Sequence, residues 1–196
     1  MKETTLYSSG LITKPKTNKS ACWDLYASLV KDDGTYKKVK CISSTGVKSE
    51  LIAITVLECS SKCEMSGKDI EIWNSMINIP PKSRILLPTG VFTAPISEDI
   101  VYFQVTLRSG FAWETGCIVP NAPGIIDQDY TGEWLINIYN PTDIDVTIRN
   151  CDRIAQCLCL KPHRFTHKLN VSPPECISSF ITDNERGDKG FGSTGK

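Results

Sequence analysis

An alternation of apolar and polar side chains with a period of two residues constrains the fold more than any other feature. It recurs over 101–107, 134–139, 144–148 and 154–160. A period of two places alternate side chains on opposite faces of a β-strand, so each segment predicts a strand with one buried face. Helical signals are scarce. We therefore expect an all-β fold, either a sandwich or a jelly roll.

Within these strands the pattern also predicts which side chains face inward. Ile144 is expected to be buried with Val146 and Ile148, and the last segment is expected to bury Ile154, Gln156, Leu158 and Leu160. Gln156 is the polar member of that set and needs a hydrogen-bond partner if it is buried.

Shorter signals organise the rest of the chain. Asp33-Gly34 favours a hairpin, Leu51 to Leu57 predicts a buried strand, and Asn140 to Asp143 supplies a turn between two strands. We expect one β domain over 1–184, with an elaboration inserted at roughly 29–78. The last residues, 185–196, contain four glycines and predict a flexible arm.

Composition narrows the partners and the compartment. Lys+Arg and Asp+Glu both number 22, so no overall positive field favours a stable complex with nucleic acid. Nine cysteines, an odd number without regular spacing, predict free thiols in a cytoplasmic compartment, or inside an infected cell if the chain is viral. We expect no membrane association, because no apolar run is long enough to span a bilayer.

The cysteines and histidines also bear on metals. The pairs Cys59 with Cys63, Cys157 with Cys159 and His163 with His167 are far apart in sequence, so we do not expect a zinc site. Cys157 and Cys159 are instead expected to be small core residues.

The segment from Asn121 to Glu133 combines two acids with glycines on both sides. Asp127 and Asp129 precede Tyr130, while Gly124 and Gly132 permit tight turns or close backbone approach. This favours a hairpin whose backbone lines a small pocket. An ordinary acidic turn explains the same residues.

Three other stretches have chemical character. Ser109 is a candidate N-cap for a short helix ended by Gly116, and such a helix start suits phosphate. Asp24 lies among apolar residues, so its carboxylate is either ion-paired or close to a hydrated cation. Phe191, between glycines of the arm, has no local neighbours and is expected to stack on a planar ligand.

A fifth stretch, from Asp152 to Gln156, enters a strand with the polar residue Gln156. In chain order, these five stretches resemble the five motifs of the trimeric dUTPase family. The resemblance implies a jelly-roll subunit of the β-clip type, a homotrimer with active sites built from several chains, and a mobile C-terminal arm. It also implies Mg²⁺-dependent hydrolysis of dUTP to dUMP and pyrophosphate by water attack on the α-phosphate. That reaction would limit uracil incorporation into DNA and supply dUMP for thymidylate synthesis.

The resemblance gives the residues of the central segment specific roles. Asp127 would activate the attacking water, and Tyr130 would pack on the deoxyribose and leave no room for a 2′-hydroxyl. The uracil edge would be bound by Asn121, Gly124, Ile125 and Ile126.

The resemblance places the remaining residues around the phosphates and the metal. Asp24 would reach Mg²⁺ through bound water, and Arg108 would support the geometry of the site. The phosphates would be held by Ser109, Gly110 and Gln156. In the arm, Phe191 would cover the uracil, and the γ-phosphate end would be bound by Arg186, Gly192, Ser193 and Thr194.

Some positions depart from the family pattern without removing a catalytic group. They are Cys22, Trp23, Leu107, Phe111, Thr131 and Cys151. Thr131 replaces a usual Arg that would make a supporting salt bridge, and Cys151 replaces a usual Gly.

Two alternative functions remain. A dCTP deaminase-like enzyme of the same fold would need a Glu where this chain has Asn137, and an amide cannot act as that general base. A regulatory protein on the dUTPase scaffold would bind a protein partner through the insertion at roughly 29–78.

Overall fold

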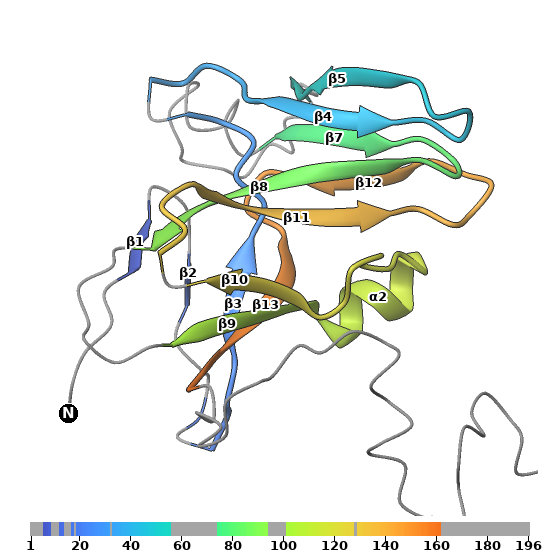
Figure 1. The fold of residues 1–196 in the computed structure, drawn as a ribbon. Coiled ribbons are helices and arrows are strands. Elements are labelled where there is room, and N and C mark those ends of the chain that lie inside the picture. The colour runs from blue at the N-terminus through green and yellow to red at the C-terminus, as the bar shows by residue number, and fades with distance from the viewer. Residues whose placement is uncertain are drawn as a thin grey trace, which may run out of the picture. The chain divides into compact units, whose positions relative to one another are not determined.

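Within the described part of the chain, antiparallel strands form three sheets and one short helix lies beside them (Figure 1). The structure, a computed structural model, describes residues 6–8, 12–13, 17, 19–31, 33–55, 74–93, 101–127 and 129–161. All of these belong to the unit of residues 1–162. The rest of the insertion, 56–73, and the arm at 185–196 lie outside the described residues.

The sheets are defined by their strand order. The first sheet has the order β1-β8-β4-β5, with β11 on the other side of β8: β1 (Leu6–Ser8), β8 (Arg84–Thr93), β4 (Lys38–Ile42), β5 (Lys48–Ile52) and β11 (Glu133–Tyr139). The second sheet has the order β10 (Gly124–Asp127), β9 (Tyr102–Leu107), β13 (Arg153–Leu160), β3 (Trp23–Tyr26) and β2 (Ile12–Thr13). The third sheet consists of β12 (Val146–Arg149), β7 (Ser75–Ile79) and β6 (Ile54–Thr55).

The core contains buried side chains from all three sheets, and the first two meet at Trp134. Trp134 of β11 is 1% exposed, and its ring centroid lies 4.8 Å from that of Phe103 of β9. The indole Nε1 donates a hydrogen bond of 2.9 Å to Thr93 Oγ1, which satisfies its polar group inside the core. The predicted alternation of β9 and β11 is confirmed, and so is the all-β fold.

The predicted inward face of β13 is wrong beyond Ile154. The pairing with β3 shifts register between Arg153 and Ala155, and a bulge there moves the following side chains to the other face. Ala155 and Cys157 are therefore buried, whereas Gln156 is only half-buried.

The two cysteines of β13 differ. Burial raises the pKa of the Cys157 thiol to about 12, so this thiol stays protonated and unreactive at neutral pH. Cys159 is exposed, which contradicts its expected place in the core.

Three other apolar residues also lie outside their expected positions. Ile144 precedes β12 and is 70% exposed. The expected buried strand from Leu51 to Leu57 is divided between β5 and β6, and Ile52 and Ile54 are each more than half exposed. Ile52 is exposed because β5 is an edge strand of the first sheet and pairs with a neighbouring strand on one side only.

Part of the insertion, the strands β4 and β5, extends the first sheet. β4 and β5 form a hairpin, and β4 pairs with β8 through Cys41 opposite Ile85. The predicted turn at Asp33-Gly34 is confirmed: Lys31 N donates to Thr35 O, and Gly34 has a φ of 82°. Within the described residues, no helix is long and apolar enough to cross a membrane.

Cys151 has a φ of 66°, in the left-handed region that favours glycine. This conformation explains why glycine is usual at this position in the family that the sequence resembles. Its N–H donates to Ala27 O at 2.9 Å, which holds the turn before β13 against the end of β3.

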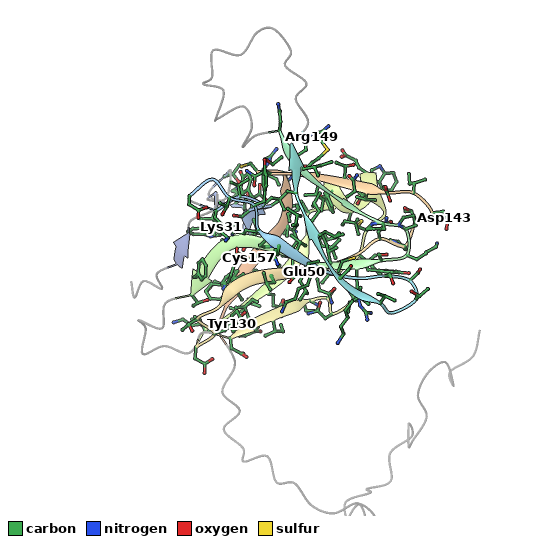
Figure 2. The ribbon with its side chains drawn as sticks, turned by 90° about the horizontal axis from the view of Figure 1, so that it is seen from above. Lys31, Glu50, Tyr130, Asp143, Arg149 and Cys157 are labelled. Atoms are coloured by element: carbon green, nitrogen blue, oxygen red, sulfur yellow. The ribbon has the colours of Figure 1, made fainter. Side chains whose placement is uncertain are left out.

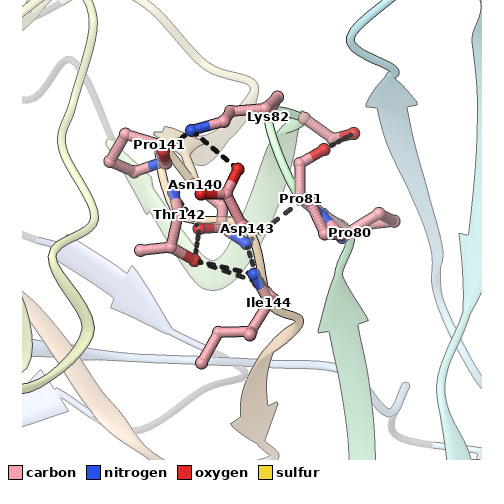
Figure 3. Close-up of polar contacts among 9 residues, drawn as sticks. Pro80, Pro81, Lys82, Asn140, Pro141, Thr142, Asp143 and Ile144 are labelled. Atoms are coloured by element: carbon pink, nitrogen blue, oxygen red, sulfur yellow. Dashed lines mark hydrogen bonds and ion pairs between the residues drawn. The ribbon is translucent and has the colours of Figure 1, made fainter.

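The turn between β11 and β12 is organised by Asn140, which is fully buried (Figure 3). Its amide Nδ2 donates to the carbonyls of Ile79, Pro80 and Ile144, at 2.9, 3.2 and 2.8 Å. Its Oδ1 accepts from the N–H and the hydroxyl of Thr142, at 3.0 and 2.7 Å. One side chain thus ties the turn to the end of β7.

Replacing this amide with a carboxylate tests the network. Asn140→Asp keeps the acceptor but places a buried charge against three carbonyl oxygens, so we expect the free energy of unfolding to fall by about 3 kcal/mol. Asn78→Asp makes the same change at an exposed site that needs only an acceptor for Thr147 Oγ1. That control is expected to cost less than about 0.5 kcal/mol in urea denaturation. Equal losses in the two variants would contradict the role of Asn140.

Candidate functional site

The segment after β10 crosses from the second sheet to the first. β10 pairs with β9, whereas β11 pairs with β8. The expectation of a hairpin is therefore wrong, because β11 buries Trp134 and its neighbours against the core from the opposite sheet. The crossing begins with a turn in which Tyr130 N donates to Asp127 O at 3.1 Å. Asp127 and Asp129 are both exposed.

Tyr130 lies back over Gly132. Its phenol Oη donates to the Glu133 carbonyl at 3.2 Å, and the side chain is 44% exposed. A Cβ atom on Gly132 would lie 2.5 Å from Tyr130 Oη and 2.6 Å from Cζ. Glycine is therefore required at 132 for this ring position. The expected close approach is confirmed at Gly132, whereas Gly124 has only ordinary contacts.

A small cavity lies beside β10, as the sequence predicted. Its volume is about 50 Å³, and its lining includes Asn121, Gly124, Ile125, Ile126 and Asn137. This volume holds a few water molecules and can receive the edge of a planar ring rather than a whole ring. The four residues expected to bind a base thus lie around one cavity.

A second group of candidate residues lies across the middle of the second sheet. Gln156 of β13 is opposite Asp24 of β3 on one side and Thr106 of β9 on the other. Arg108 Nε donates to Asp24 Oδ1 at 3.0 Å, and Arg153 Nη1 lies 3.6 Å from Asp24 Oδ2. Of the two alternatives for Asp24, the structure shows the ion pair. Arg108 has the acidic neighbour expected of a supporting residue.

The helix α2 (Ser109–Thr115) follows this group. Its N-cap is Arg108, with no side-chain cap, so the expectation that Ser109 is the N-cap is wrong by one residue. Ser109 and Gly110 start the helix and are exposed. The predicted end is confirmed, since Gly116 is the C-cap with a φ of 70°.

The two groups lie apart within one chain. Asp127 is opposite Tyr102 at the start of β9, whereas Arg108 and Ser109 follow its last residue, Leu107. Six strand residues span roughly 20 Å at about 3.3 Å each. In Figure 2, Tyr130 and Asp143 mark opposite ends of the first-sheet strand β11. Gly116, the C-cap of α2, lies beside Thr142, which follows the far end of that strand. Within a single chain, Asp127 therefore lies far from the start of α2.

Sequence reasoning missed Lys37 as a neighbour of this site. Lys37 Nζ lies 2.7 Å from Glu133 Oε1. The residues are 96 positions apart, and no local pattern pairs them.

Arg186, Phe191, Gly192, Ser193 and Thr194 lie outside the described residues, as do Cys59, Cys63, His163 and His167. Among the residues that are described, no three His, Cys, Asp or Glu side chains gather in a way that could hold a metal ion.

Comparison with known proteins assigns the family. The dUTPase family profile matches residues 55–195. A deoxyuridine 5'-triphosphate nucleotidohydrolase of Leptospira interrogans is 36% identical over 133 residues, which cover 67% of this chain and 86% of that protein. The Cytophaga hutchinsonii protein of the same name is 32% identical over 154 residues, 78% of this chain and 94% of that protein. The chain belongs to the dUTPase family.

Solved structures support the same fold. The dUTPase of Staphylococcus bacteriophage 80alpha with dUPNHPP has a TM-score of 0.59 and 18% identity, over 100% of both chains. The native EIAV dUTPase has a TM-score of 0.53 and 17% identity, over 86% of this chain and 97% of that chain. The all-β dUTPase fold expected from the sequence is therefore confirmed.

The contact between Gly132 and Tyr130 generates a prediction. Gly132→Ala forces the ring away and breaks its hydrogen bond to the Glu133 carbonyl. With 3-fluorotyrosine incorporated, we expect the ¹⁹F resonance of Tyr130 to move toward that of free 3-fluorotyrosine, with Tyr130→Phe providing its assignment. Gly124→Ala is the control, because a Cβ there meets Val105 O at an ordinary 3.6 Å. An unmoved resonance in the Gly132→Ala variant would refute the contact.

Proposed function

We propose that this protein hydrolyses dUTP to dUMP and pyrophosphate by attack of water on the α-phosphate. The observation that carries the proposal is the exposed carboxylate of Asp127 at the end of β10, whose earlier residues line the cavity beside Asn121. Membership of the dUTPase family supports the same reaction.

Base selection is proposed to rest on β10. This strand is at the edge of the second sheet, so part of its backbone is not used in pairing with β9. N–H and carbonyl groups of Gly124 to Ile126, with the Asn121 amide, can therefore bond the uracil edge. Cytosine reverses the donor and acceptor pattern at the 4-position and N3, and it would leave these groups unpaired.

Asp127 is proposed to orient the water and take its proton as general base. Tyr130, three residues later, would pack on the deoxyribose and exclude a 2′-hydroxyl. Both side chains are exposed, so a bound nucleotide can reach them.

The phosphate groups are proposed to be held by Ser109, Gly110 and Gln156 of another copy of the chain. A phosphate held by Ser109 must lie next to the phosphorus attacked by the water of Asp127, with reacting atoms about 3 Å apart. Within one chain these residues are roughly 20 Å apart along β9. A homotrimer with shared sites removes this conflict. The arm, with Arg186 and Phe191 to Thr194, is proposed to close over the nucleotide.

Mg²⁺ is proposed to bind mainly to phosphate oxygens and water. The described residues offer no cluster for direct coordination, which suits an ion that keeps its waters. Asp24 is the candidate contact through water, although Arg108 and Arg153 already neutralise its charge. When bound, the ion would offset the negative charge of the triphosphate.

The cavity favours hydrolysis over deamination. Asn137 lines it, and among its described lining residues there is no carboxylate to serve as the base for deamination. By its chemistry, the proposed reaction would limit uracil incorporation into DNA and supply dUMP for thymidylate synthesis.

Two measurements test the proposal. With Mg²⁺ present, pyrophosphate release from dUTP should exceed that from dCTP, dTTP and UTP, with kcat/KM ratios of about 10² or more.

Asp127→Asn should reduce kcat by about 10³ while dUTP still binds. The control Asp129→Asn, which makes the same change two residues away, should keep kcat within about threefold. Comparable rates for the four nucleotides, or an Asp127→Asn variant of normal activity, would refute the proposal.

A further inference from the structure

Lys37, within the insertion, makes a shielded ion pair with Glu133, the last residue of the proposed nucleotide-binding segment 121–133. Its Nζ lies 2.7 Å from Glu133 Oε1 and 3.1 Å from Ser28 Oγ. The Lys37 and Glu133 side chains are only 15% and 23% exposed. Solvent screens such a pair less than a surface pair, so its attraction is stronger than that of an exposed pair.

Glu133 is held from a second direction by β8. The same Oε1 atom accepts a hydrogen bond of 2.7 Å from Gly90 N. Glu133 is opposite Phe92 of β8, and the register shifts between Glu133 and Leu135. The carboxylate therefore fixes the first residue of β11 at a point where regular strand pairing is interrupted.

The main chain of Glu133 in turn holds Tyr130. Its carbonyl accepts the phenol hydrogen bond at 3.2 Å, and Gly132 leaves the space that the ring occupies. The contacts thus run from Lys37 to Glu133 and from Glu133 to Tyr130. We propose that Lys37 is a positioning residue for Tyr130, and that the insertion acts on sugar selection through this contact. This inference rests on the proposed function, in which Tyr130 packs on the deoxyribose.

The proposal predicts a specific kinetic pattern. Tyr130 would contact the sugar equally in the ground state and in the transition state, so a loosened ring raises KM and leaves kcat unchanged. It also admits a 2′-hydroxyl more readily, which lowers the preference for dUTP over UTP. A merely structural defect would not change that preference.

The residue next to Lys37 offers a matched control. Lys38, the next residue, pairs with Glu50 at 3.0 Å, and both side chains are more than half exposed. Among the described residues, neither Lys38 nor Glu50 makes a hydrogen bond or ion pair with Glu133 or Tyr130, so the pair is expected to contribute little to their positions.

The kinetic experiment compares Lys37→Ala, Lys37→Arg and Lys38→Ala with the wild type. For Lys37→Ala we expect the KM for dUTP to rise about fivefold, kcat to stay within about twofold, and the ratio of kcat/KM for dUTP to that for UTP to fall about fivefold. Lys37→Arg should restore most of the ratio, and Lys38→Ala should leave it unchanged. An unchanged ratio in Lys37→Ala, or an equal fall in Lys38→Ala, would overturn the proposal.

A second measurement does not depend on turnover. Amide hydrogen exchange should accelerate in the 127–134 segment of Lys37→Ala but not of Lys38→Ala. If Lys37→Ala does not fold, Lys37→Gln keeps a donor without the charge and takes its place. If the wild-type protein does not hydrolyse dUTP but exchange accelerates in Lys37→Ala, the proposed function alone is refuted. If exchange does not accelerate in Lys37→Ala, the contact itself is refuted.

Discussion

The pairing of β11 with β8 is the interaction on which the segments at both ends of β11 depend. It runs from Leu135 opposite Pro88 to Tyr139 opposite Arg84. At one end, Glu133 is fixed by Gly90 and Lys37 beside Tyr130; at the other, Asn140 ties the turn to the end of β7. Between them Trp134, Ile136 and Ile138 fill the core. The strand thus sets where the candidate segment 121–133 ends, and it does so through packing rather than through the loop itself.

Local sequence pattern predicted what depends on local chemistry. The strands β9 and β11, the turn at Asn140 and the helix end at Gly116 follow from alternation, turn residues and a left-handed C-cap, which act over a few residues. The face of β13 could not be predicted, because the bulge after Arg153 reverses the alternation without any glycine or proline to mark it. Lys37 was missed for a related reason: its partner is fixed only when β4 and β11 both pair with β8.

Two departures from the family pattern gain a physical context. Cys151 adopts the left-handed backbone for which glycine is usual, so the fold accommodates a strained residue at this turn. Thr131 stands where an Arg is usual, two residues before Glu133, whose carboxylate is paired with Lys37 of the insertion. The insertion therefore provides a cation beside the segment in which the family's usual cation is lacking.

The separation between Asp127 and Ser109 makes sharing of sites between copies the central claim. Its most direct test combines two inactive variants in one assembly. One chain carries Asp127→Asn, and the other carries both Ser109→Ala and Gln156→Ala. The two chains are co-expressed with different tags, and mixed assemblies are purified through both tags. In a cyclic trimer every mixed assembly holds one neighbour pair with both sets intact, so we predict about one third of wild-type dUTP hydrolysis. Mixed assemblies no more active than the two parent proteins would contradict the account.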